Sequence, residues 1–293
     1  MWIIGFLIGA NLGSFAKALA DRSLKEKSFK GRSYCEFCKK KLSWCDLLPI
    51  LSFCLLRGKC RYCGKRLSLE YVLVEVVMGI LVGYLFYQNF QNFQSIYNYQ
   101  FLNFLFELIF KIFFITVLAV IFLTDLKKMF VPDRVIIPSI KIAFASLLAF
   151  YIYKVAYLYT YLLNDPLGKH LISSTDYFIR HAVSTIYPFL GSLAVGIGVA
   201  AMFYLLIVIT KGKGMGGGDV KLGLFLGLGL GFPNGILAVL LGFLSGAIIG
   251  GLALLIGKKN LKSQIPFGPF LIFGSLTTLF FGDLIINWYI LGY

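Results

Sequence analysis

Apolar runs of about 20 residues recur along the whole chain, and they limit what it can fold into. Each run is long enough to cross the hydrocarbon core of a bilayer, roughly 30 Å thick, as a helix. Because 59% of the 293 residues are hydrophobic and only 14% are charged, a soluble domain is excluded. The sequence therefore predicts an all-α polytopic membrane protein with about eight transmembrane helices. We expect these helices near residues 1–19, 71–87, 101–123, 132–153, 187–210, 220–232, 236–256 and 265–293.

The net charge of +15 is concentrated in the loops at alternate ends of these helices. A nucleic-acid-binding protein would spread basic residues over one face, whereas this distribution follows the positive-inside rule. We therefore expect no nucleic-acid partner, and we expect the basic loops to face the cytoplasm. The largest of them, residues 20–70, holds 13 of the 28 Lys and Arg. The other basic residues at this side are Lys127, Lys128, Arg134, Lys211, Lys213, Lys258, Lys259 and Lys262.

Two aspartates lie at the cytoplasmic ends of predicted helices. A carboxylate costs roughly 2.5–3.5 kcal/mol at the centre of a bilayer, so an acid at the edge of an apolar run is rarely accidental. Asp125 ends the third run, and Asp219 directly follows the glycine-rich stretch 214–218. The distribution of loop charge places both acids on the same side of the membrane.

The glycines before Asp219 suit a peptide substrate. Gly216, Gly217 and Gly218 have no Cβ and permit positive φ, so an extended backbone could pass within contact distance. Two carboxyls a few Å apart share one proton near neutral pH. The ionised carboxyl activates water, and the protonated one polarises the scissile carbonyl. The sequence therefore predicts an aspartic protease dyad formed by Asp125 and Asp219.

A structural interpretation of the same acids stays open. Asp219 would cap a helix, and Asp125 would pair with Lys127 or Lys128. Neither role requires the two acids to meet.

Two further acids are weaker candidates for the dyad. Asp133 follows Pro132 at the expected start of the fourth helix, which is typical of a turn or cap residue. Asp283 lies near the outer end of the last helix, on the opposite side from Asp125 and Asp219. We therefore interpret both as structural.

Cysteine spacing indicates a metal site in residues 20–70. The chain has two CxxC pairs with 21 residues between them, a spacing close to that of zinc ribbons. Four thiolates bind Zn²⁺ tetrahedrally and close the site, so the metal would be structural. The alternative is a pair of disulfides, which a reducing cytoplasm disfavours. The predicted ligands are Cys35, Cys38, Cys60 and Cys63, and the small apolar residues Cys45 and Cys54 remain.

These motifs together resemble the type IV prepilin peptidases, bacterial membrane aspartic proteases of the GxGD kind. The resemblance covers nearly the whole chain. Its motifs are Gly13-Ser14-Phe15 with Arg22, the two cysteine pairs, Trp44-Cys45-Asp46-Leu47-Leu48-Pro49 with Ser52, Gly58-Lys59-Cys60-Arg61-Tyr62-Cys63, Tyr71 with Glu75, Asp125 with Pro132-Asp133, Gly216-Gly217-Gly218-Asp219, and Ile265-Pro266-Phe267-Gly268-Pro269-Phe270.

The resemblance implies an activity, partners and a location. The family's two catalytic aspartates correspond to Asp125 and Asp219. The family cleaves the short basic leader of type IV prepilins and pseudopilins after a glycine, at the cytoplasmic face of the bacterial inner membrane. Many members then methylate the new N-terminus with S-adenosylmethionine. The methyltransferase role corresponds to the 20–75 region, including Glu75. The chain departs from the family at Lys17, where Asn is usual, and a lysine there could extend to the interface.

Other hypotheses remain beside this one. The chain could be a leader peptidase without methyltransferase activity, or a presenilin-like GxGD protease. It could instead be a transporter or scaffold with buried acids, although such acids would be spread along a pathway through the membrane. The expected domains are the first transmembrane helix at 1–19, the cysteine-rich loop at 20–70 with a methyltransferase-associated region to about 100, and the peptidase domain at 101–293.

Overall fold

The computed structural model describes residues 1–29, 31–91, 98–174, 176–212, 215–255 and 266–291. The described residues form helices and two isolated β-bridges, which confirms the all-α class. Several residues used above lie outside the described ranges: Lys213, Gly214, Lys258, Lys259, Lys262 and Ile265. The helices are α1 (Trp2–Leu24), η1 (Trp44–Leu47), α2 (Leu51–Leu55), α3 (Glu70–Gln91), α4 (Asn98–Lys128), α5 (Asp133–Asn164), α6 (Pro166–Ser174), α7 (Tyr177–Ile209), α8 (Gly217–Leu230), α9 (Asn234–Leu255) and α10 (Gly268–Leu291).

Seven helices among the described residues are long and apolar enough to cross a membrane: α1, α3, α4, α5, α7, α9 and α10. The eighth predicted span corresponds to α8, which has only 14 residues. At 1.5 Å per residue it is roughly 21 Å long, shorter than the hydrocarbon core. The protein is therefore a multi-pass membrane protein in which α8 is a short helix.

Helices were expected to end near residue 153 and to begin again near residue 187, but the segment between them, 154–186, is mostly helical. Helix α5 continues to Asn164, and α7 begins at Tyr177. The Tyr- and Leu-rich residues before Asn164 continue the helix, since no Gly or Pro interrupts them. Asp165 alone separates α5 from α6.

The described chain falls into two compact units, Met1–Pro132 and Asp133–Tyr293. In the first unit, α1 packs closely along α3. A Cβ at Gly9 would lie 2.3 Å from the Met78 carbonyl oxygen, and a Cβ at Gly13 would lie 2.9 Å from the Glu75 Cα. Glycines spaced four residues apart on α1 therefore permit the close contact between the two helices.

Charged residues join three helix ends of the first unit. Lys17 of α1 is 2% exposed and forms ion pairs with Asp21 at 2.5 Å and Glu70 at 3.6 Å. Lys127 of α4 pairs with Glu70 at 2.8 Å, and Lys128 donates a hydrogen bond to the Leu24 carbonyl at 3.0 Å. The C-terminal ends of α1 and α4 therefore lie with the N-terminal end of α3. Lys17 extends toward the C-terminal end of α1 and is held in this network by Asp21 and Glu70.

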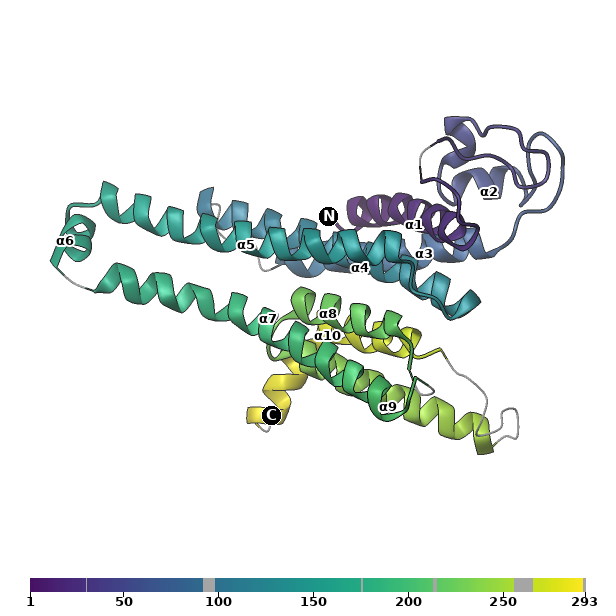
Figure 1. The fold of residues 1–293 in the computed structure, drawn as a ribbon. Coiled ribbons are helices and arrows are strands. Elements are labelled where there is room, and N and C mark those ends of the chain that lie inside the picture. The colour runs from purple at the N-terminus through teal and green to yellow at the C-terminus, as the bar shows by residue number, and fades with distance from the viewer. Residues whose placement is uncertain (30, 92–97, 175, 213–214, 256–265, 292–293) are drawn as a thin grey trace. The chain divides into compact units, whose positions relative to one another are not determined.

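The second unit contains two closely packed helix pairs. Helix α7 packs on α8, where a Cβ at Gly227 would lie 2.3 Å from the backbone of Gly196. Helix α9 packs on α10, where a Cβ at Gly274 would lie 2.3 Å from the Ala238 carbonyl oxygen. Figure 1 shows α5 and α7 joined by α6 at their far ends. Small residues thus bring the backbones of α7 and α8, and those of α9 and α10, into direct contact.

Candidate functional site

The four predicted zinc ligands come together in the first unit. The sulfurs of Cys35, Cys38, Cys60 and Cys63 all lie within 4.8 Å of one another. The Cys35 and Cys63 sulfurs are 3.9 Å apart. A tetrahedral Zn²⁺ with bonds of about 2.3 Å to sulfur needs its ligands roughly 3.8 Å apart, so the thiols fit such an ion.

Disulfides are absent from the described cysteines. All six side chains are free thiols, including Cys45 and Cys54, which lie outside the cluster. The disulfide alternative is therefore not supported. Because thiolates are soft ligands, a set of four favours Zn²⁺ over harder cations.

The two cysteine knuckles repeat one another at an interval of 25 residues. Each contains C-x-aromatic-C followed by a basic residue, leucine and serine. The Cys35 N–H donates a hydrogen bond to the backbone carbonyl of Lys40 at 3.0 Å, and the Cys60 N–H donates to that of Lys65 at 2.9 Å. Their aromatic contacts are reciprocal, since Lys65 lies over Phe37 and Lys40 lies over Tyr62. The repeat explains why four thiols converge: two equivalent turns face each other.

Asp46 connects the end of the first knuckle to the second. Its carboxylate accepts hydrogen bonds from the Ser43 hydroxyl at 2.7 Å and the Ser43 N–H at 3.1 Å. It also forms an ion pair with Arg61 at 2.8 Å. Burial alone would raise the pKa of the Asp46 carboxyl, but Ser43 and Arg61 hold it below its ordinary value. The Asp46 carboxylate therefore stays charged at neutral pH, and its ion pair with Arg61 links the two knuckles.

Glu75 connects the cysteine loop to the membrane helices. Its Oε2 accepts a hydrogen bond of 2.8 Å from the backbone N–H of Ile50. Ile50 has φ 62° and ψ −50°, and the Leu51 N–H donates to the Pro49 carbonyl. This is a γ-turn of the rarer, strained hand, which a β-branched residue adopts only when its surroundings hold it there. Glu75 is therefore a fixed point for the loop.

A cavity of about 860 Å³ lies between the cysteine loop and the ends of α1, α3 and α4. Its polar lining includes Lys17, Asp21, Glu70, Tyr71 and Glu75. The Tyr71 hydroxyl donates a hydrogen bond to Asp21 at 3.2 Å. The ammonium nitrogen of Lys17 lies 4.6 Å from the centre of the Tyr71 ring. The volume is within the usual range for a small-molecule site, and the lining carries both signs of charge.

Asp125 lies near the C-terminal end of α4 and is 5% exposed. The two lysines of the structural interpretation have partners elsewhere: Lys127 pairs with Glu70, and Lys128 bonds to Leu24. Asp125 therefore combines a buried carboxyl with a position at the end of the unit that carries the charged network.

Asp219 lies in the second unit, in the first turn of α8. Gly216 occupies the N-cap position of α8, and Asp219 is the third residue of the helix. A negative charge in a first helical turn is stabilised by the helix dipole. The structure describes each unit by itself, and the two aspartates belong to different units.

The glycines before Asp219 leave open space but do not use positive φ. A Cβ at Gly216 or Gly217 would meet no atom within 4 Å. Gly216 has φ −90° and ψ 155°, and Gly217 begins α8 with Gly218 after it. The left-handed conformation occurs instead at Gly212, with φ 75°. The space expected from the sequence is present at Gly216 and Gly217. It comes from the missing Cβ atoms, and not from a positive φ at these residues.

The weaker acid candidates have structural partners in the second unit. Asp133, in the first turn of α5, pairs with Lys221 at 2.5 Å. Asp283 accepts a hydrogen bond from Asn234 at 3.3 Å. Because Asn234 follows the C-terminal end of α8, Asp283 lies at the end of the unit opposite Asp219. These contacts support the interpretation of Asp133 and Asp283 as structural residues, which stays a prediction.

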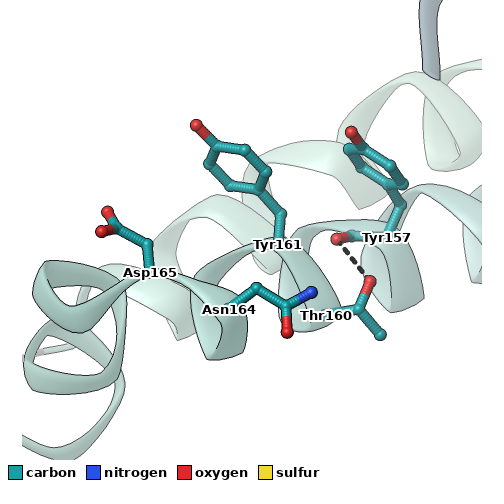
Figure 2. Close-up of a pocket in the computed structure, with 5 residues that line it drawn as sticks. All are labelled: Tyr157, Thr160, Tyr161, Asn164 and Asp165. Carbon is teal, nitrogen blue, oxygen red and sulfur yellow. Dashed lines mark hydrogen bonds between the residues drawn. The ribbon is translucent and has the colours of Figure 1, made fainter. Parts of the chain in front are cut away.

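A second, shallower pocket lies at the far end of α5. It has a volume of about 240 Å³ and is lined by Tyr157, Thr160, Tyr161, Asn164 and Asp165. Figure 2 shows that all five side chains come from one stretch of the chain, where Thr160 bonds to the Tyr157 carbonyl. It contains none of the candidate site residues.

Comparison with known proteins assigns the chain to a family. A protein 31% identical over 293 residues, covering 99% of this chain and 98% of the relative, is a prepilin leader peptidase/N-methyltransferase from Bacillus subtilis (strain 168). The chain belongs to the type IV leader peptidase family. The family model of that description matches residues 112–251, and the model for the bacterial peptidase A24 N-terminal domain matches residues 7–89.

Other relatives with the same name span most of the chain. One from Legionella pneumophila is 29% identical, covering 91% of this chain and 78% of the relative. One from Aeromonas salmonicida (strain A449) is 27% identical, covering 88% and 74%. No solved structure matches the chain. The four cysteines and Glu75 fall within the N-terminal family match, and both candidate aspartates fall within the peptidase match.

Proposed function

We propose that the protein is a membrane aspartic endopeptidase that removes the leader of type IV prepilins and pseudopilins, cutting after a glycine. The observation that carries this proposal is the family match over both units, with carboxyl groups at Asp125 and Asp219. Within the second unit, Asp133 at the start of α5 pairs with Lys221, two residues after Asp219.

In the proposed mechanism, the two aspartates act as a pair that holds one proton. The ionised carboxyl takes a proton from water as the water attacks the scissile carbonyl. The protonated carboxyl donates a hydrogen bond to that carbonyl, and a proton then passes to the leaving amine. Either residue can take either role, because the pair titrates as a unit. The open space beside Gly216 and Gly217 would receive the extended leader backbone.

We also propose that the first unit methylates the new N-terminus. The relatives' names include N-methyltransferase, and S-adenosylmethionine supplies a methyl group when it is bound. The cavity beneath the cysteine loop fits this donor in size and charge. Asp21 and Glu70 would attract its cationic groups, and the basic lining residues would attract its carboxylate. Zinc at the four cysteines would hold the loop over this cavity.

The active side of the protein is proposed to face the cytoplasm of a bacterial inner membrane. Basic residues concentrate in the 20–70 loop and at the ends of α4 and α5, as the positive-inside rule requires. A prepilin has a basic leader and an apolar mature end, so its scissile bond would lie where water meets lipid. The division into a first helix, a cysteine loop and a peptidase domain from residue 101 stays a prediction.

Incubation with a prepilin tests both activities. We expect the purified full-length protein to shorten a prepilin by its leader, with the cut after the glycine. Addition of S-adenosylmethionine should then increase the product's mass by one methyl group. Mass spectrometry of the product distinguishes the hypotheses: cleavage without methylation would leave a leader peptidase alone, and no cleavage would favour a transporter or scaffold.

Glu75 should affect methylation far more than cleavage. Glu75→Ala removes the acceptor of the Ile50 N–H, and losing a hydrogen bond to a charged group costs about 1.5–3 kcal/mol. We expect methyl transfer to fall by about tenfold or more, while cleavage stays nearly intact. The two rates are measured with the same prepilin by mass spectrometry.

Glu75→Gln is the matched control, because its amide oxygen can still accept from Ile50. Methylation retained by Gln and lost by Ala would mean that Glu75 acts by holding the loop. Loss by both would mean that the charge is needed. Equal loss of cleavage and methylation would instead show that Glu75 supports the whole fold.

A further inference from the structure

The cysteine loop exposes an unusual number of large apolar side chains. Within the twelve residues of η1, α2 and the turn between them, five such side chains are exposed. They are Trp44, Leu47, Leu48, Leu51 and Leu55, with Trp44 75% and Leu55 81% exposed. We call these five residues the η1–α2 surface. A dense apolar group of this kind marks a contact with another apolar phase or partner.

The opposite face of α2 already has its own contacts. Phe53 packs against Gly58, where a Cβ would lie 2.9 Å from the ring. Ser52 and Phe53 both line the cavity, and of the five exposed apolar residues only Leu47 also lines it. Leu51 and Leu55 are one turn apart and so share a different face of the helix. Leu51 and Leu55 therefore lie on the face of α2 that does not pack against the rest of the cysteine loop.

The bond between Ile50 and Glu75 fixes the depth of this surface. Glu75 lies five residues after the first residue of α3, so it is about 7.5 Å along the helix from its cytoplasmic end. Ile50 directly precedes Leu51, and its N–H reaches the Glu75 carboxylate at 2.8 Å. Leu73, two residues before Glu75, is 63% exposed, and Leu69, directly before α3, is 73% exposed. The η1–α2 surface is thus held beside the edge of a membrane-spanning helix.

The charge around this surface matches an acidic membrane. Residues 20–70 contain 13 Lys and Arg against five Asp and Glu. Basic segments next to a membrane helix are attracted to anionic phospholipid headgroups. Tryptophan is enriched in the headgroup region, and leucine side chains reach the acyl boundary from a segment lying in the interface.

We propose that the η1–α2 surface is a membrane-interface anchor that lies among the headgroups of an acidic phospholipid leaflet. The anchor holds the cysteine loop against the bilayer at the level of Glu75. The proposal does not depend on the peptidase or methyltransferase activity.

Tryptophan fluorescence in lipid vesicles tests this proposal on the full-length protein. The chain has three tryptophans, so Trp2→Phe with Trp288→Phe leaves Trp44 alone. The protein is reconstituted in vesicles of phosphatidylglycerol and phosphatidylcholine, with part of the phosphatidylcholine brominated close to the headgroup. We expect Trp44 to lose most of its emission and to emit at shorter wavelength than tryptophan in water. Vesicles of phosphatidylcholine alone should give weaker quenching.

Two variants make the test specific. Leu51→Ser with Leu55→Ser should reduce the quenching of Trp44 without unfolding the protein, because both side chains are exposed. The control moves the tryptophan to the first knuckle, as Phe37→Trp with Trp44→Phe. Phe37 is 54% exposed in the same loop but lies outside the η1–α2 surface, so we expect little quenching there.

Four results would overturn the proposal. Unquenched emission of Trp44 at the wavelength of tryptophan in water would place the surface in solvent. Emission at shorter wavelength without quenching would show that protein covers Trp44, either the second unit or another copy. Equal quenching at positions 37 and 44 would show that the contact with lipid is not specific to this surface. Quenching independent of phosphatidylglycerol would remove the role of acidic lipid.

Discussion

Asp125→Asn and Asp219→Asn should each abolish prepilin cleavage while the protein still inserts into the membrane and binds its substrate. Asparagine has nearly the shape of aspartate but can neither take up nor carry the proton. For catalytic groups that act as a unit, loss of one member costs about 10⁴-fold or more in rate. For the same reason, the double variant should be no slower than either single variant. Single-turnover cleavage, followed by mass spectrometry with enzyme in excess, measures these rates.

Asp133→Asn is the matched control for this experiment. It makes the same chemical change eight residues after Asp125, but Asp133 is exposed and its partner is Lys221. An exposed ion pair is worth about 0–1 kcal/mol, so cleavage should change by only a few fold. Substantial cleavage by either Asp125→Asn or Asp219→Asn would rule out this dyad. Abolished cleavage in Asp133→Asn would move the search to that residue.

The membrane architecture could be predicted because it depends on local composition. Length and hydropathy identify the seven long helices, although they also predicted a span at the short helix α8. The i, i+4 spacing of Gly5, Gly9 and Gly13 identifies the face that α1 presents to α3. Hydropathy could not locate the end of α5, because tyrosine-rich turns beyond the membrane continue a helix as readily as they form a loop. Helix ends outside the bilayer are decided by local breakers and packing.

The polar contacts of the first unit could not be predicted, because they join distant parts of the chain. Lys17 meets Glu70 across 53 positions of sequence, and no local pattern connects them. Likewise, nothing in the residues around Ile50 indicates that Glu75 accepts its N–H. The resemblance to a family singled out Glu75, but only the structure shows what the carboxylate contacts.

The cysteine site is a mixed case. The two CxxC pairs predicted a metal site directly, since four thiols at ribbon spacing have few other uses in a reducing compartment. The 25-residue repeat was also present in the sequence, as C-x-aromatic-C followed by basic residues, leucine and serine. Aligning the two knuckles would have shown that they form equivalent turns. Their reciprocal contacts between lysine and aromatic rings depend on the folded pair and could not be predicted.

The metal site should determine whether the cysteine loop folds. Apparent binding free energies of structural zinc sites are about 10–16 kcal/mol, and this energy is part of the folding energy of a small metal-bound segment. Residues 31–66 have two short helices and two isolated β-bridges, so they contain little regular structure to hold them without the ion. Cys35→Ser replaces one of four thiolates by a poor zinc ligand. We expect it to release the metal and to loosen residues 31–66, while the membrane helices stay folded.

Elemental analysis and hydrogen exchange together measure this outcome. Protein purified without chelators should contain one zinc ion per chain, and Cys35→Ser should contain almost none. Backbone amides in the loop should exchange faster in Cys35→Ser, with those of α4 and α10 unchanged. Cys54→Ser is the matched control, because Cys54 is an exposed free thiol outside the cluster and should keep both metal and protection. Protein that lacks metal from the start but protects the loop fully would show that the knuckles fold through their hydrogen bonds and ring contacts instead.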